Sequence, residues 1–466
     1  MPRSKLIDGL VWVLVPPGLV LWVAAQHRNS YFLYDEWVML ERVVAGQAVH
    51  QSLIGFNGHL WAVPYLVFHL QLGLFGAESS VLVFFALCMS LLALHVSAAL
   101  VLIRLGVPTP VAVLAAALVT YFGPGAETMV LEYEFAANLA LALSLFAAYV
   151  VLRVPVPRPR DGVAVSVLLV AAVACDSGIA LVALPFTILV VVVAWSRRWA
   201  AIALATPLLV LLVWTVLDQA KVFAPDGCPN CWPATFSAPL GWSLRFGFAL
   251  LAQAAGGLVG AGQGVGYVVL LGGLVMLVIA VRHHRVDRVR AWAAIGGWLS
   301  ALTAVASVTY SRAGFWPTEQ EAIRSFMGPS NRYVQSVALF LLLGLLPVVV
   351  RTVRWPARLP AWSGVALASA ALIVVFVLNI PGVNETRSFY KGWSNRVRLD
   401  VQASADVLAH GCSSGSAPDP DAVPTAGSSP QITVGLVQDL LERGALEPST
   451  APPNPAFVDL ICQPTT

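Results

Sequence analysis

The feature that most constrains this chain is a series of apolar stretches, each long enough to cross a lipid bilayer. About 20 apolar residues in a helix span the hydrocarbon core, and runs near this length recur up to residue 380. Only 11% of the residues are charged, whereas a soluble domain has about a quarter. We predict an all-α polytopic membrane protein with about eleven transmembrane helices. They are expected at residues 10–25, 79–103, 108–123, 131–152, 162–175, 178–196, 199–217, 264–281, 291–309, 334–350 and 362–380.

The placement of arginine predicts the orientation of these helices. Short loops rich in Lys and Arg remain in the cytoplasm. With the spans above, arginines fall in alternate loops: Arg104; Arg153, Arg158 and Arg160; Arg197 and Arg198; Arg282, Arg285, Arg288 and Arg290; and Arg351, Arg354 and Arg358. The protein is therefore expected in the plasma membrane, with a cytoplasmic N-terminus and an extracytoplasmic C-terminus. This orientation requires that the apolar stretch from Ser243 to Val259 is a juxtamembrane or re-entrant helix rather than a span.

Two regions follow from this topology. Residues 1–381 are expected to form a transmembrane domain, and residues 382–466 a small extracytoplasmic region. Residues 26–78 form the first outer loop, in which 60–75 is short and contains His69 and Gln71, and is therefore expected to be interfacial or re-entrant. The polar C-terminal region predicts helices at residues 401–409 and 433–443, joined by a flexible segment from 413 to 430.

The cysteines fit an oxidising outer face. Cys412 and Cys462 both fall in the C-terminal region and could pair. Cys228 and Cys231 have a C-x-x-C spacing in an outer loop, which favours a local disulfide. A zinc site there would need four ligands, and no second pair lies nearby in the sequence.

The residues with the clearest chemical potential are Asp35 and Glu36, in an aromatic segment directly after the first span. Adjacent side chains point in different directions, so one carboxylate can face a cavity while the other holds the loop. A carboxylate in a partly apolar pocket has a raised pKa, which suits a general base that removes a proton from a hydroxyl group. The alternative is a solvated helix N-terminus, where acidic residues are favoured by the helix dipole.

Three short motifs, together with the topology, resemble the GT-C superfamily of integral membrane glycosyltransferases. They are Tyr34-Asp35-Glu36-Trp37; Asn57-Gly58-His59-Leu60 with Val63-Pro64; and Ser330-Asn331-Arg332-Tyr333 at the start of a late span. This superfamily includes protein O-mannosyltransferases, aminoarabinose transferases and cell-wall arabinofuranosyltransferases. The histidine is not followed directly by Pro-Pro, and the C-terminal region is smaller than in many members, so the subfamily and the acceptor remain open.

The resemblance implies a reaction and a set of site residues. The donor would be a polyprenyl-phosphate sugar, and the acceptor an extracytoplasmic glycan, lipid or protein. Asp35 would act as the base, and Glu36 would assist it or order the loop. A cation would stabilise the phosphate leaving group. Arg332 is the first candidate for this role, and Arg324 and Arg312 are the next. The other substrate-binding residues would be Asn57, His59, Tyr333 and Glu134. No metal ligand is assigned, although a divalent ion is compatible with the two carboxylates.

Two other classes of membrane protein that use lipid-linked sugars would have different sequence features. A transporter or flippase of lipid-linked sugars would place charges near the centre of the membrane and repeat its broken helices in matching halves. An O-antigen ligase or polymerase would use a large late outer loop, and residues 310–333 form only a modest one.

Nucleic-acid binding is not expected, because no basic stripe is interleaved with aromatic residues.

Overall fold

The structure is a computed structural model that describes most of the chain. The residues described are 3–26, 31–46, 48–56, 58–222, 238–282, 286–315, 317–321, 331–352, 361–413, 416–425, 432–449 and 452–464. Several residues named above lie outside these ranges: Asn57, Cys228, Cys231, Arg285, Arg324, Ser330, Arg354 and Arg358.

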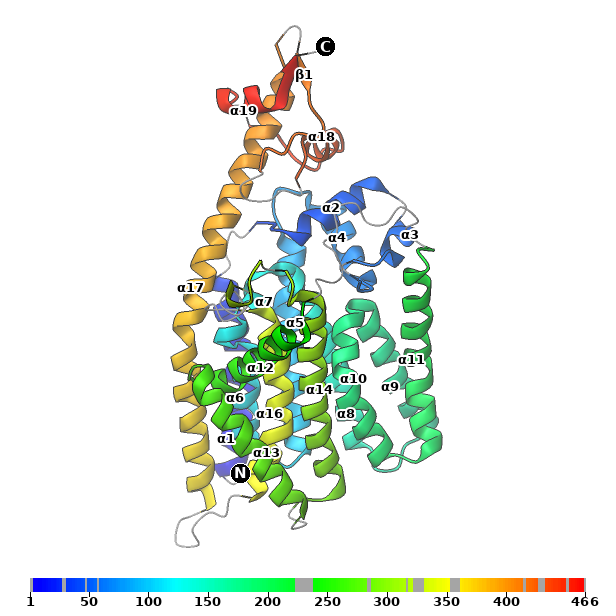
Figure 1. Ribbon diagram of the computed structural model, residues 1–466, viewed down its shortest axis with the longest axis vertical. Coiled ribbons are helices and arrows are strands. Elements are labelled where there is room, and N and C mark those ends of the chain that lie inside the picture. Colours follow the sequence, from blue (N-terminus) through cyan, green and yellow to red (C-terminus); the bar gives the residue numbers. More distant parts are fainter. Residues whose placement is uncertain are drawn as a thin grey trace.

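The described part is almost entirely helical (Figure 1). The helices are α1 (Arg3–Gln26), α2 (Asp35–Ala45), α3 (Ala48–Leu53), α4 (Ala62–Phe75), α5 (Val81–Arg104), α6 (Thr109–Thr120), η1 (Gly123–Gly125), α7 (Glu127–Val130), η2 (Glu132–Glu134), α8 (Phe135–Arg153), α9 (Pro159–Cys175), α10 (Ser177–Ala194), α11 (Arg197–Gln219), α12 (Leu240–Gly257), α13 (Gln263–Arg282), α14 (Arg288–Arg312), α16 (Arg332–Thr352), α17 (Ala361–His410), α18 (Val434–Glu442) and α19 (Pro455–Ile461). Two short strands, β1 (Ser416–Pro418) and β2 (Cys462–Pro464), pair antiparallel.

Within the described ranges, nine helices are long and apolar enough to cross a membrane, as in a multi-pass membrane protein. The two further spans expected from the sequence form shorter helices. α6 has 12 residues because the chain turns into η1 at Gly123-Pro124-Gly125. α9 has 17 residues because the next residue, Asp176, caps α10 instead of extending α9. The stretch from Ser243 to Val259 corresponds to α12, which is not among the nine candidate spans.

Close helix packing positions the ends of α14 and α16. Gly296 and Gly297 on α14 face α10 and α16 respectively. A Cβ atom at 296 would lie 2.9 Å from the Cα atom of Phe186, and one at 297 would lie 2.6 Å from the carbonyl oxygen of Phe340. Small residues let helix backbones approach closely in membranes, and they set α14 against both of its neighbours here.

Two arginines from different loops meet at one end of the bundle. At this end, which we call the arginine end, the Arg290 side chain donates a hydrogen bond to the carbonyl oxygen of Leu105 at 2.7 Å. The side chain of Arg351 lies close to Gly106 at the same place. We call the opposite end, which carries α2, α3 and α4, the capped end (Figure 1). Arg290 and Arg351 come from two different loops that the sequence places on the same side of the membrane, and the structure has them at the same end.

The first outer loop forms the cap. The stretch from residue 60 to 75, expected to be interfacial or re-entrant, becomes the 14-residue helix α4, which packs on α2 and α5. A helix of this length is too short to cross a bilayer, which takes about 20 residues. Figure 1 shows α2, α3 and α4 together above the ends of the long helices.

The helix expected at residues 401–409 is not separate, because α17 runs for 50 residues from Ala361 to His410. It passes residues 381 and 382 without a break, although the composition changes there. Its continuity has a sequence basis: Val383, Tyr390, Val397, Val401 and Ala405 are buried and recur at helical spacing. Figure 1 shows α17 along the full height of the molecule.

The C-terminal region closes on the end of α17 and on the cap. A disulfide joins Cys412 to Cys462, so this predicted pairing is confirmed. Arg443, which follows α18, donates a hydrogen bond to the carbonyl oxygen of Val44 at 2.5 Å. The amide of Ala77 donates to the carbonyl oxygen of Ala445 at 2.6 Å. The C-terminal region is thereby fixed to the loop that carries Asp35 and Glu36.

Candidate functional site

The acidic pair lies at the first turn of α2, directly after a strained residue. Tyr34 has a φ of 46°, a left-handed conformation that costs a non-glycine residue about 1–3 kcal/mol. The preceding segment is fixed to α17, because the amide of Tyr31 donates to the Ser394 hydroxyl at 2.8 Å. Backbone strain of this kind gathers at functional sites, and here it sets the direction in which α2 begins.

The two carboxylates point to different places. Glu36 accepts hydrogen bonds from the amide of Leu33 at 2.5 Å and from the amide of Tyr133 at 2.9 Å. It therefore joins the start of α2 to η2, nearly a hundred residues away in sequence. Asp35 instead lines a cavity, and no described residue donates a hydrogen bond to its carboxylate. The division expected for adjacent acids, one facing a cavity and one holding the loop, is the arrangement in the structure.

Burial raises the pKa of both groups. For Asp35, the nearby Arg332 and Arg312 counter part of this effect. For Glu36, burial and the neighbouring Glu132 hold the pKa well above its usual range, although the two backbone hydrogen bonds oppose the rise.

Replacing Glu36 by glutamine should destabilise the fold, whereas replacing Asp35 by asparagine should not. Two backbone N–H groups donate to the two oxygens of Glu36, and a glutamine side chain has only one oxygen. One buried N–H group would be left unpaired, which costs about 2 kcal/mol. Thermal unfolding of the detergent-purified variants would measure the difference. Equal melting temperatures for Glu36→Gln and Asp35→Asn would contradict the holding role of Glu36.

The stabilisation by Glu36 should also depend on pH with a definite sign. A folded-state pKa above the unfolded value means that the folded chain binds the proton more tightly. The contribution is therefore complete below the unfolded pKa and is lost as pH rises through the folded pKa. We expect the advantage of the wild type over Glu36→Gln to shrink as pH rises through that range.

The cavity beside Asp35 has a volume of about 640 Å³ and lies at the capped end of the bundle. It brings together the starts of α2, α8 and α16, the end of α14, the turn before α4 and the junction of α9 with α10. Of the residues singled out from sequence, Asp35, His59, Glu134, Arg332 and Tyr333 line it. Glu36 does not. Arg312 lines it as well.

Two guanidinium groups form one side of the cavity. Arg332 lies 3.4 Å from a carboxylate oxygen of Glu134 and is sandwiched between the rings of Tyr133 and Tyr333, at 5.3 and 5.2 Å from their centres. The Tyr333 hydroxyl accepts hydrogen bonds from Arg332 at 3.2 Å and from Arg312 at 3.4 Å. The tyrosine therefore holds both cations at the same wall.

Glu127 ties this wall to α17. Its carboxylate accepts the amide of Arg332 at 3.1 Å and the hydroxyl of Tyr390 at 2.8 Å. The start of α16 is thus held by Glu127, a residue to which the sequence motifs gave no role.

An aspartate orients His59 on the opposite side. His59 Nδ1 is hydrogen-bonded to Asp176 at 3.0 Å, which leaves Nε2 as the ring nitrogen available to a ligand. Asp176 also accepts from the indole of Trp61 at 3.1 Å and from the amide of Ile179 at 3.0 Å. Burial alone would raise the pKa of Asp176, but His59 and these hydrogen bonds outweigh it and lower the pKa. Asp176 therefore remains charged beside the imidazole.

The position of the His59 ring depends on a glycine in the next helix. A Cβ atom at Gly178 would lie 2.0 Å from ring atoms of His59. The short Asp176-Ser177-Gly178 junction therefore supplies both the partner of the ring and the space for it. The sequence did not predict the pairing of Asp176 with His59, because the two residues are 117 positions apart.

Within the described ranges, no three His, Cys, Asp or Glu side chains gather as a metal site. The charged groups of the cavity are instead arranged as a free carboxylate, an arginine wall and an Asp–His pair. Such a cavity can remove a proton on one side and stabilise an anion on another.

Comparisons with known proteins do not assign the chain to a family. No protein-family model matches the sequence. The search of curated proteins also found no match. The function is therefore argued from the site itself.

Proposed function

We propose that this protein is a membrane glycosyltransferase of the GT-C type. It would transfer a sugar from a polyprenyl-phosphate donor to a glycan, lipid or protein acceptor at the extracytoplasmic face, which would be the capped end. One observation carries the proposal: the Asp35 carboxylate faces a cavity and accepts no hydrogen bond from the described part of the chain, and two guanidinium groups line the same cavity.

The reaction uses these groups in one displacement. The acceptor hydroxyl oxygen attacks the anomeric carbon of the donor sugar, and Asp35 takes the hydroxyl proton. The bond between the anomeric carbon and the phosphate oxygen breaks, and polyprenyl phosphate leaves with the bonding electrons. Arg332 and Arg312 stabilise the charge that develops on this phosphate, as preorganised cations do most effectively.

The distribution of buried acids supports an enzyme over a transporter. A transporter would place charged groups near the centre of the membrane. Among the described residues, the buried carboxylates other than Asp406 line either this cavity or the neighbouring pocket at the same end. Within α5, the buried His95 is hydrogen-bonded to the carbonyl oxygen of Val113 at 3.0 Å, which is a packing role.

The direct test is a transfer assay with purified protein. Polyprenyl-phosphate sugars and an oligosaccharide acceptor are supplied together, and the expected products are a new glycosidic bond and free polyprenyl phosphate in equal amounts. Movement of the lipid-linked sugar across a vesicle membrane, with no new bond in any combination, would favour the flippase instead.

Two substitutions should weaken transfer by displacing His59 in different ways. Asp176→Asn removes the charge beside the imidazole but keeps a good helix cap, because Asn and Asp cap equally well. Gly178→Ala places a methyl group where the ring now lies. Misplacement of a substrate-binding group by about 1 Å can cost up to about 100-fold in rate, so we expect losses of about tenfold to 100-fold in kcat/KM for both.

Gly241→Ala is the matched control for these variants, because a Cβ atom there meets nothing within 4 Å. It should transfer sugar at the wild-type rate. If Gly178→Ala were equally active, a role for His59 at the substrate would be excluded.

A further inference from the structure

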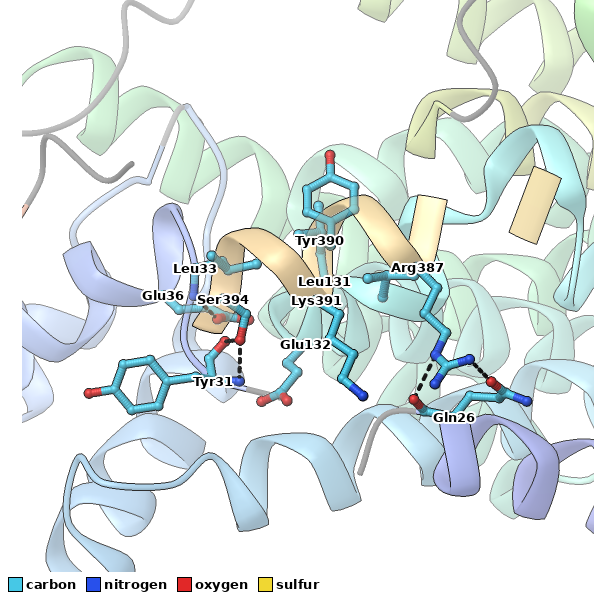
Figure 2. A pocket seen from close by; sticks show the side chains of 11 residues that line it. Gln26, Tyr31, Leu33, Glu36, Leu131, Glu132, Arg387, Tyr390, Lys391 and Ser394 are labelled. Carbon is cyan, nitrogen blue, oxygen red and sulfur yellow. Dashed lines mark hydrogen bonds between the residues drawn. The ribbon is translucent and has the colours of Figure 1, made fainter. Parts of the chain in front are cut away.

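A second pocket lies next to the cavity and is not used by the proposed reaction. It is a small hollow, open to solvent, and is formed by the end of α1, the segment before α2, η2 and the middle of α17 (Figure 2). Glu36 lines this pocket rather than the cavity of Asp35. The start of α2 therefore separates two hollows that are each lined by charged side chains among apolar ones.

Two cations on α17 enter this pocket. Arg387 and Lys391 are one helical turn apart, and Figure 2 shows both side chains reaching into the space above Gln26 and Glu132. Arg387 donates through Nε to the Gln26 carbonyl oxygen at 2.7 Å and through Nη1 to the Gln26 side chain. Lys391 has no hydrogen bond or ion pair to any described residue and is exposed. Its ammonium group therefore has three donors available to a ligand.

The acids of the pocket are already engaged. Glu36 accepts two backbone amides, and one oxygen of Glu132 accepts the Ser80 hydroxyl at 2.8 Å. Burial also raises the pKa of Glu36, which reduces its negative charge. The Ser394 hydroxyl is also engaged, because it accepts the amide of Tyr31 and donates to the carbonyl oxygen of the same residue. The groups left to meet a ligand are consequently the two cations, which suits an anion.

The pocket lies where a lipid headgroup would be. Gln26 ends the first candidate span, and the candidate span of α17 continues into the pocket. Leu21 on α1 and Leu378 on α17, which precede the pocket, are 68% and 58% exposed. Leu378 and Arg387 are nine residues apart, which is roughly 14 Å along a helix. Cations just beyond an exposed apolar surface match the depth of lipid phosphates.

We propose that Arg387 and Lys391 bind the phosphate group of a membrane lipid in this pocket, with the acyl or prenyl chains lying along the apolar surface below. The proposal does not depend on the transferase reaction, because it concerns a different pocket and different residues. The ligand is a phosphate monoester or diester, whose oxygens accept the Lys391 and Arg387 donors.

The test compares three probes on the full-length protein in detergent. Phosphatidic acid and diacylglycerol of the same acyl chains differ only in the phosphate, and inorganic phosphate lacks the chains. Lipid retention is measured by native mass spectrometry. We expect the wild type to retain phosphatidic acid, to retain diacylglycerol at least tenfold less (about 1.4 kcal/mol), and to be unaffected by millimolar inorganic phosphate.

Lys391→Gln should reduce retention of phosphatidic acid about tenfold. Because Lys391 makes no hydrogen bond or ion pair to a described residue, stability should not change. Arg387→Gln should reduce retention too. Arg396→Gln, on the same helix and exposed outside the pocket, is the control and should retain the lipid. Equal retention by Lys391→Gln and the wild type would overturn the proposal. Displacement of phosphatidic acid by inorganic phosphate would overturn the lipid part and leave a free-phosphate site.

Discussion

Asp35→Asn should reduce sugar transfer by about 1,000-fold, within the range that a general base contributes. Asparagine has the same shape but cannot take the acceptor proton. Because no described residue hydrogen-bonds to the carboxylate, the fold should be unaffected. Initial rates from the transfer assay, with melting temperatures measured in parallel, check both halves of this expectation.

The pH dependence of the transfer rate gives a second test of the role of Asp35. Burial raises its pKa, and Arg332 and Arg312 only partly counter the effect. A base must be deprotonated, so the wild-type rate should rise with pH through a pKa above the usual aspartate range. This acidic limb should be absent from the residual activity of Asp35→Asn.

The matched control is Asp439→Asn, which removes an exposed acid of α18 at the same end of the molecule. It should leave the rate unchanged. Transfer by Asp35→Asn at more than about a tenth of the wild-type rate would be too fast for loss of a general base, and would exclude Asp35 as that base.

Arg332→Gln should cost both stability and activity, for two separable reasons. The arginine is the ion-pair partner of Glu134, whose side chain is only 9% exposed. Leaving a buried charge without its partner costs about 3 kcal/mol. Burial raises the pKa of Glu134, so the cost should be smaller at a pH where Glu134 takes up a proton. Loss of the cation at the leaving phosphate should reduce kcat by about 100-fold, as for other groups that stabilise developing charge.

A double variant separates the two effects. Arg332→Gln with Glu134→Gln removes both charges, so most of the lost stability should return. Activity should not return, because the phosphate still lacks its cation. Melting temperature and kcat measured on the same preparations test this. Recovery of wild-type kcat in the double variant would show that Arg332 has only a structural role.

Secondary structure and charge distribution were largely predictable from the sequence. Spans and arginine-rich loops depend on local hydropathy and on charges within a few residues, which a linear reading contains. The predicted boundary between residues 175 and 178 agrees with the structure, in which Asp176 caps α10. The predicted span at 108–123 is longer than α6, because the Gly123-Pro124-Gly125 segment follows as a separate turn. The break expected within α17 did not occur. The buried residues at helical spacing between Val383 and Ala405 stabilise the helix by more than Pro381 and Gly382 destabilise it.

The sites depended on contacts that no local pattern contains. Motif resemblance indicated Asp35, His59 and Arg332, and the structure places all three around one cavity. It gave Glu36 the role of assisting Asp35 or ordering the loop, but it did not indicate the contact that Glu36 makes, because its partner is the amide of Tyr133 on a distant turn.

The sequence by itself determined that this is a helical multi-pass membrane protein with an acidic pair at one end, because hydropathy and charge act locally along each helix. Only the tertiary structure decided the separate roles of Asp35 and Glu36, the pairing of His59 with Asp176, and the second pocket with Arg387 and Lys391. Each of these joins residues from distant helices, and their proximity is set by how the helices pack against one another.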